Sequence, residues 1–301
     1  MEEHSLKTGS RFFLVTLLNV MITLFELVGG LLSGSLSLLS DAFHNFGDAF
    51  SIILSYAANR IGKRAPTVKN TYGFRRAEIL AALLNSILLI AISAFLMLEA
   101  LRRFMHPEEV HGGIMLVVAV VSFTANLFST ILLNNDSKHN LNIRATYLHL
   151  LSDALASIGV IISAALILLF KINWVDPLMT LLVSLYIIYE SWPIVHKTFA
   201  ILMEASPQLD FENIKTDLLT IPEITGVHHL HAWLIDENEL VLSVHVNMAD
   251  LPLSQTECVY LKIENILKQN YNVSHVTIQA ECNRGRGTKL LLDKEKDFHN
   301  N

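Results

Sequence analysis

Six long apolar stretches dominate this chain and limit what it can fold into. They cover residues 12–32, 36–58, 77–101, 113–133, 147–170 and 175–195. About 20 consecutive apolar residues are enough for a helix to cross the hydrocarbon core of a bilayer. Only 17% of the 301 residues are charged, whereas a soluble domain carries about 25%. The sequence therefore predicts an α-helical membrane protein with six transmembrane helices.

The composition changes near residue 205, where the apolar runs become short. The pattern beyond it predicts a helix, two strands, a second helix and a third strand, at 211–220, 226–235, 240–248, 254–269 and 273–281. This order is typical of a small two-layer α+β domain. We therefore expect a transmembrane domain over residues 1–204, a cytosolic domain over 205–282, and a polar, disordered tail over 283–301.

Basic residues indicate how the helices are oriented. The link between the second and third apolar stretches holds Arg60, Lys63, Arg64, Lys69, Arg75 and Arg76. Loops rich in lysine and arginine stay on the cytoplasmic side of a membrane. An even number of spans then places both termini in the cytoplasm. The net charge of −6 argues against nucleic acid as a partner.

The pattern His-x-x-x-Asp occurs twice inside apolar stretches, at His44–Asp48 and at His149–Asp153. Residues four apart lie on one face of a helix, separated by about 40° of rotation. Two such helices facing each other offer two imidazoles and two carboxylates, a donor set that suits tetrahedral zinc. An aspartate at the centre of a spanning helix costs about 2.5–3.5 kcal/mol on insertion scales, so a functional role is expected.

We call these four residues the quartet and expect them to bind one divalent cation near the middle of the bilayer. Two carboxylates would neutralise the charge of the ion. Metal binding requires deprotonated ligands, so protons compete for the same groups and metal can exchange against H⁺. The alternative is that these residues only join helices through hydrogen bonds, a role that we assign to Asn19, Asn85 and Asn126.

Further acids fall in the apolar stretches. We interpret Glu78, Glu99 and Glu190 as structural or interfacial, whereas Asp41 and Glu26 need separate treatment. Asp41 lies three residues before His44 and therefore on nearly the same helix face. It is a candidate for an extra ligand, a group that hydrogen-bonds a ligand, or a proton carrier, and we favour the second role. The role of Glu26 stays open.

Histidines also gather on the predicted strands of the C-terminal domain. A three-residue hairpin loop would place His231 opposite His245 on one face of the sheet, and Gln279 and Glu281 on the last strand are candidates to complete a metal site. A two-residue loop would separate the two histidines. Cys258 and Cys282 are further candidates. The alternative is a set of surface histidines on a half-exposed sheet.

Three segments together resemble the cation diffusion facilitator family, in particular its bacterial cobalt-zinc-cadmium resistance branch. They are residues 40–48 (SDAFHNFGD), 71–78 (TYGFRRAE) and 142–153 (NIRATYLHLLSD). The resemblance covers essentially the whole chain. It implies six transmembrane helices, a ferredoxin-like cytosolic domain and a homodimer. It also implies efflux of Zn²⁺, with Cd²⁺ and Co²⁺ left open, driven by inward H⁺ movement.

The resemblance further implies specific metal sites. It assigns transport to the quartet, and it implies that His231, His245 and Glu281 bind a structural Zn²⁺ in the cytosolic domain. Asn70 and Phe74 stand where some family members hold another site, which we therefore expect to be absent. The loop between the fourth and fifth apolar stretches is short, which favours a prokaryotic inner-membrane protein.

Two other functions are alternatives to transport. A membrane-embedded metal hydrolase would hold zinc with the same quartet, but catalytic zinc usually keeps three protein ligands and an open position. The chain has neither a His-Glu-x-x-His motif nor a Gly-x-Ser-x-Gly motif. A metal sensor with the C-terminal domain as its output would not explain six spans. We therefore expect a transporter and not an enzyme.

Overall fold

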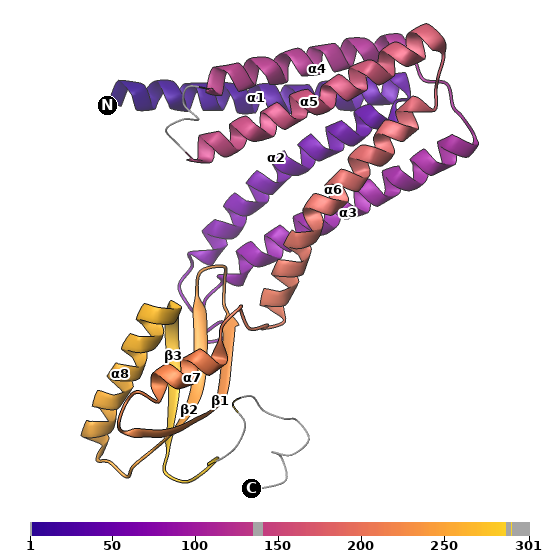
Figure 1. Ribbon diagram of the computed structural model, residues 1–301. Coiled ribbons are helices and arrows are strands. Elements are labelled where there is room, and N and C mark those ends of the chain that lie inside the picture. The colour runs from indigo at the N-terminus through magenta and orange to yellow at the C-terminus, as the bar shows by residue number, and fades with distance from the viewer. Residues whose placement is uncertain (1, 135–140, 287–289, 291–301) are drawn as a thin grey trace. The chain divides into compact units, whose positions relative to one another are not determined.

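The structure is a computed structural model that describes residues 2–134, 141–286 and 290 (Figure 1). The chain divides into two compact units. The helical unit comprises residues 1–56 and 81–195, and the sheet unit comprises residues 57–80 and 196–301. The α2–α3 link therefore groups with the C-terminal part of the chain, not with the helices that it joins.

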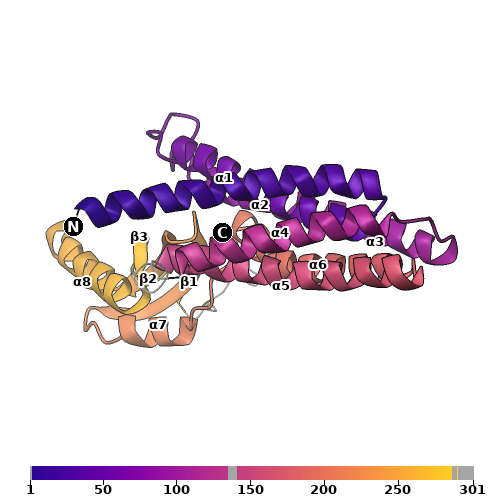
Figure 2. The same cartoon turned by 90° about the horizontal axis from the view of Figure 1, so that it is seen from above.

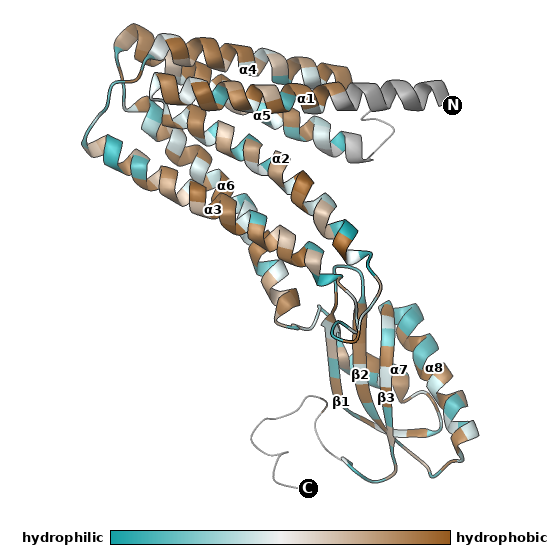
Figure 3. Cartoon of the chain, turned by 180° about the vertical axis from the view of Figure 1, so that it is seen from behind, coloured by the Kyte–Doolittle hydropathy of each residue, from teal (hydrophilic) through white to brown (hydrophobic). Residues whose placement is uncertain are grey.

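Six long helices carry the apolar stretches. They are α1 (Glu2–Ser33), α2 (Leu36–Gly62), α3 (Arg76–Met105), α4 (Gly112–Leu133), α5 (Leu141–Phe170) and α6 (Val175–Leu202). Figure 3 shows how strongly hydrophobic residues dominate these helices. By length and composition, five helices in the described part of the chain can cross a membrane, which confirms the expected helical membrane protein. The exception is α2, whose polar residues lower its hydropathy, so the sixth span stays a prediction.

Within the helical unit, α4 packs against both α1 and α5, and the three helices run side by side in Figures 1 and 2. A buried cluster joins Leu38 at the start of α2 to Met115 on α4 and Ala164 on α5. A second cluster joins Leu36 on α2 to Leu96 on α3, with Leu181 of α6 packed beside it. These apolar contacts hold α2 between the other helices.

The starts of α2 and α6 are tied together by one buried carboxylate. Asp176, the second residue of α6, accepts hydrogen bonds from the backbone N–H of Leu36 at 2.8 Å and of Ser37 at 3.2 Å. It also accepts from the hydroxyl groups of Ser35 and Ser37, each at 2.6 Å. The first N–H groups of a helix lack partners within the helix. Asp176 supplies partners for two of them and places both helix starts at the same end of the unit.

The sheet unit contains α7 (Phe211–Leu218), β1 (Ile224–Leu234), β2 (Leu240–Met248), α8 (Leu253–Tyr271) and β3 (Val273–Glu281). The strand order is β1-β2-β3, with β1 and β2 antiparallel and β2 and β3 parallel. A parallel pair needs a crossover connection, and α8 provides it. The predicted α+β domain and its order of elements are confirmed.

The predicted disordered tail does not hold for all of residues 283–301. Leu290 is buried in the core of the sheet unit, and its carbonyl accepts a hydrogen bond of 2.9 Å from the N–H of Leu230. The carbonyl of Arg284 accepts from the Asn247 side chain at 2.8 Å. Residues 287–289 and 291–301 lie outside the described part of the chain. The division at residues 204 and 205 stays a prediction.

Candidate metal sites

The two His-x-x-x-Asp patterns form two matching pairs on two helices. On α2, Nε2 of His44 lies 3.6 Å from Oδ2 of Asp48. On α5, Nε2 of His149 lies 3.6 Å from Oδ2 of Asp153. Each pair follows directly from helix geometry, because residues four apart share a face.

Asp48 connects the two pairs. Its Oδ2 lies 3.1 Å from Nε2 of His149, and the imidazole rings of His44 and His149 meet edge to face with centroids 5.9 Å apart. Tetrahedral zinc with ligands at about 2.0–2.1 Å places neighbouring ligand atoms about 3.3 Å apart. The three contacts of 3.1–3.6 Å in the quartet are close to this spacing. His44, Asp48 and His149 are therefore spaced as zinc ligands are, and Asp153 adjoins them through His149.

Several atoms of the quartet are buried without satisfying partners. Oδ2 of Asp48, Oδ2 of Asp153 and Nε2 of His149 are shielded from solvent, and none makes a well-oriented hydrogen bond within the described residues. Buried polar atoms are normally paired. One divalent cation would satisfy all three atoms, and the two carboxylates would balance its charge.

The four residues are not equally close to one another. Ligand atoms of His44, Asp48 and His149 all lie within 4.8 Å of one another. Asp153 stands beside His149, with its side chain only 5% exposed. The structure therefore brings three quartet members into one group and places the fourth, more deeply buried, next to it.

The quartet lines a cavity of about 660 Å³ formed by α2, α3, α5 and α6. Its wall includes further polar residues, among them Asp41, Asn85 and Glu190. A polar cavity inside an apolar helical unit gives water and ions a place beside the candidate ligands. The arrangement suits a site that exchanges its ion with solvent.

Glu26 and Asp41 form a polar group behind the quartet. Glu26 on α1 is fully buried, and Nδ2 of Asn45 donates a hydrogen bond of 3.0 Å to its Oε2. The carboxyl groups of Asp41 and Glu26 also interact electrostatically. This arrangement agrees with a supporting role for Asp41. The sequence patterns do not predict the hydrogen bond between Asn45 and Glu26. Asn45 directly follows His44, and this position is the feature of the sequence that could indicate a role near the quartet.

A second group of ligands lies in the sheet unit. Nε2 of His228 lies 3.2 Å from Oε2 of Glu281, and Nδ1 of His245 lies 3.2 Å from Oε1 of Glu281. Ligand atoms of these three residues lie within 4.8 Å of one another. Gln279 donates to Oε1 of Glu281 at 2.6 Å, so it orients the carboxylate. The structure brings His245 and Glu281 together as predicted, but the third member is His228.

His231 lies apart from this group because of the strand register. Leu234 pairs with Leu240, which places His231 opposite Ser243. An irregularity between His228 and His231 then brings His228 opposite His245. His229 takes a positive φ of 53° there. A β-bulge adds one residue to one strand and shifts every side chain beyond it.

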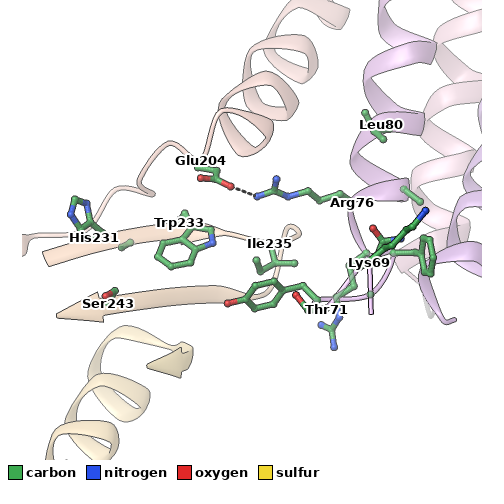
Figure 4. Close-up of a pocket in the computed structure, with 16 residues that line it drawn as sticks. Lys69, Thr71, Arg76, Leu80, Glu204, His231, Trp233, Ile235 and Ser243 are labelled. Carbon is green, nitrogen blue, oxygen red and sulfur yellow. Dashed lines mark hydrogen bonds and ion pairs between the residues drawn. The ribbon is translucent and has the colours of Figure 1, made fainter. Parts of the chain in front are cut away.

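His231 instead lines a different cavity of the sheet unit, about 870 Å³ in volume. Figure 4 shows it at the opposite end of this cavity from Arg76, which forms an ion pair with Glu204 at 3.2 Å. Burial lowers the pKa of His231, and the nearby His229 lowers it further. Burial also lowers the pKa of His245, although Glu281 opposes this effect. Both imidazoles are therefore biased towards the neutral form that metals require.

The two cysteines contribute to neither site. Cys258 and Cys282 are both exposed and free, and neither belongs to a group with metal-binding geometry among the described residues. Thiol ligation was the weakest of the predicted options. The candidate ligands are therefore imidazoles and carboxylates only.

Comparison with known families gives matches to both parts of the chain. Residues 12–203 match the family described as cation efflux transmembrane domain. Residues 206–282 match the cytoplasmic domain of cation efflux proteins. The chain belongs to the cation efflux family. This is the cation diffusion facilitator family that the sequence motifs resemble.

Individual relatives in the cation efflux family agree over nearly the full length. The zinc transporter ZitB of Escherichia coli is 36% identical over 92% of this chain and 88% of its own length. A cadmium, cobalt and zinc/H⁺-K⁺ antiporter of Bacillus velezensis is 36% identical, over 92% of this chain and 91% of its own. CzcD of Cupriavidus metallidurans, a metal cation efflux protein, is 33% identical, over 85% and 81%.

Proposed function

We propose that the chain exports Zn²⁺ from the cytoplasm through a bacterial inner membrane in exchange for protons. The quartet is the transport site, and its spacing of 3.1–3.6 Å between ligand atoms is the observation that carries this proposal. Two imidazoles and two carboxylates are ligands that zinc accepts in tetrahedral geometry. One relative is named a zinc transporter, and another is named an antiporter of cadmium, cobalt and zinc against H⁺ and K⁺. Both names support zinc as the cargo, and the second supports exchange with protons.

Competition between metal and protons supplies the coupling. Zinc binds only when the imidazoles are neutral and the carboxylates are ionised, and protons occupy the same groups after the ion has left. If the helices move around the site, the cavity beside the quartet opens to only one side of the membrane at a time. Alternating access of this kind exchanges one cargo for the other without opening a continuous pore.

The protein carries zinc and does not use it for catalysis. Four protein ligands fill the coordination shell of zinc, whereas a catalytic ion keeps a position open for water. The second site, with His228, His245 and Glu281, is proposed as a structural zinc site in the cytosolic domain. A homodimer joined through this domain is proposed from the match to the cytoplasmic domain of cation efflux proteins.

Flux in proteoliposomes tests the transport function. Protein is reconstituted with a zinc-sensitive dye inside the vesicles, and zinc is added outside at the same time as a pH gradient. An acidic interior is expected to accelerate zinc uptake, because protons leave as zinc enters. Asp153→Ala removes one quartet carboxylate and is expected to abolish uptake.

Glu109→Gln is the matched control, since Glu109 is exposed and lies in the link between α3 and α4. This variant is expected to transport like the wild type. Exchange of external K⁺ for Na⁺ shows whether K⁺ takes part. Zinc binding without flux under every gradient would overturn the proposal and favour a sensor.

A further inference from the structure

Two acidic residues of the cavity, Asp41 and Glu190, are not members of either candidate metal site. Glu190 of α6 lines the same cavity as the quartet, and Tyr186, one helical turn earlier, interacts with it electrostatically. Among the described residues, the group of mutually close ligand atoms is His44, Asp48 and His149, without Glu190. Glu190 therefore lies near the quartet without joining it.

The tie between Asp176 and Leu36 locates Glu190 along the helices. Because α2 and α6 start at the same end, residue counts from those starts give comparable depths. Asp48 is 12 residues after Leu36, or about 18 Å along α2 at 1.5 Å per residue. Glu190 is 15 residues after Val175, or about 22 Å along α6. Glu190 thus lies most of a turn beyond Asp48, further from the Asp176 end.

The wall of the cavity continues in the same direction. Ser51 follows Asp48 on α2, Ile194 follows Glu190 on α6, and Leu148 precedes His149 near the start of α5. The basic residues predict that both chain termini are cytoplasmic. In that topology α2 and α6 end at the cytoplasmic side and α5 starts there, so this direction leads to the cytoplasm. Glu190 therefore stands between the quartet and the cytoplasmic mouth of the cavity.

Exposure and charge indicate what Glu190 does at this position. Its side chain is exposed although it lies in the middle of a 28-residue helix. An ionised group facing lipid at this depth costs several kcal/mol, so it belongs in a water-filled space. Glu190 interacts electrostatically with both His149 and Asp153. Asp153 lines the same cavity, with a buried Oδ2 that lacks a hydrogen-bond partner in the described chain.

We propose that Glu190 captures hydrated divalent cations at the cytoplasmic mouth and passes them to His149 and Asp153. The inference rests on the proposed transport function. A carboxylate on the path raises the local cation concentration and accelerates association, while the equilibrium affinity is set by the quartet. The ligand is a divalent cation that keeps most of its water until it reaches the quartet.

Rapid-mixing measurements test the capture role independently of transport. Zinc association is followed in detergent by competition with a zinc-sensitive dye, for wild type, Glu190→Gln and Glu190→Asp. Glu190→Gln is expected to slow association and dissociation about fivefold to tenfold, with equilibrium affinity changed by less than about twofold. Glu190→Asp keeps the charge and is expected to restore most of the rate. Higher ionic strength should reduce the difference between Glu190→Gln and wild type.

Flux gives a second readout. Glu190→Gln is expected to raise the KM for zinc about fivefold to tenfold with kcat nearly unchanged, and Glu109→Gln is expected to match the wild type. An unchanged association rate in Glu190→Gln would overturn the capture role. A loss of equilibrium affinity above about tenfold would also overturn it, because Glu190 would then be a ligand. Absence of flux in the wild type would overturn the transport function, while the association rates would still decide the role of Glu190.

Discussion

Oδ2 of Asp176, at the start of α6, accepts a hydrogen bond of 2.8 Å from the backbone N–H of Leu36, at the start of α2. The two residues are 140 positions apart in the sequence. Asp176 is fully buried, and the positive ends of two helix dipoles favour its negative charge. Through this contact, the helix that carries His44 and Asp48 is fixed at one end to the helix that carries Glu190.

Loss of the Asp176 charge should destabilise the helical unit. Hydrogen bonds to an ionised group are worth about 1.5–3 kcal/mol each, and Asp176→Ala leaves several buried donors of α2 unpaired. We expect a clearly lower Tm in detergent for Asp176→Ala and a smaller decrease for Asp176→Asn, which keeps one acceptor. Asp250→Asn changes an exposed aspartate and should leave the Tm unchanged. An equal Tm for Asp176→Ala and wild type would show that the stability of the helical unit does not depend on this contact.

Metal binding by the sheet unit should depend on His228 and not on His231. The test uses a chain in which Asp48→Ala and Asp153→Ala have removed the proposed transport site, so that calorimetry reports only the second site. His228→Ala is expected to abolish zinc binding there, because it removes a ligand 3.2 Å from Glu281. His231→Ala should bind zinc with nearly unchanged affinity. Loss of binding in His231→Ala but not in His228→Ala would instead support the pairing of His231 with His245 that a three-residue hairpin loop predicts.

Gly285 should be necessary for the position of His228. A Cβ atom at residue 285 would overlap the His228 ring, and the φ of +67° at this residue favours glycine. Gly285→Ala in the same background is expected to weaken zinc binding about tenfold or more. Gly113→Ala is a suitable control, since its Cβ would meet no atom closer than 4.0 Å. Unchanged affinity in Gly285→Ala would mean that the backbone after β3 yields without moving His228.

Stability of the metal-free protein should fall on mild acidification. Burial lowers the pKa values of His231 and His245 in the folded chain, whereas an unfolded histidine has a pKa of about 6.5. Between the folded values and about pH 6.5, the unfolded chain binds more protons, so stability is complete above that range and is lost as the pH falls through it. Urea unfolding with EDTA at pH 7.5 and pH 5.5 measures the difference. The change should be smaller in His231→Gln, and greater stability at pH 5.5 would contradict the assignment.

Asp41 and Asp48 should respond differently to the loss of charge. Asp41 lines the cavity of the quartet and interacts with Glu26, so Asp41→Asn is expected to weaken zinc binding by about 10–100-fold, as is typical for groups that support ligands. Asp48→Asn removes a proposed ligand that contacts both His44 and His149 and is expected to abolish binding at the quartet. Calorimetry of both variants in a His228→Ala background compares them. Complete loss of binding in Asp41→Asn would make Asp41 a ligand.

Local sequence patterns determined most of the secondary structure and the pairing of side chains in the candidate transport site. Apolar stretches of spanning length gave the helices, and the repeated His-x-x-x-Asp pattern gave His44, Asp48, His149 and Asp153. Both depend on interactions within one helix, where spacing along the chain fixes which side chains share a face. The order of helices and strands in the C-terminal domain followed from similar short-range periodicity.

Contacts between distant segments decided the remaining features. The bulge at His229 replaced His231 by His228 at the second site, and the pairing of Asn45 with Glu26 joined α1 to α2. Leu290 returned to bond Leu230 at the same bulge. Strand register, helix pairing and buried hydrogen bonds are set by which donors and acceptors meet when the whole chain packs. A sequence pattern specifies each donor and acceptor, but only the tertiary structure brings particular ones together.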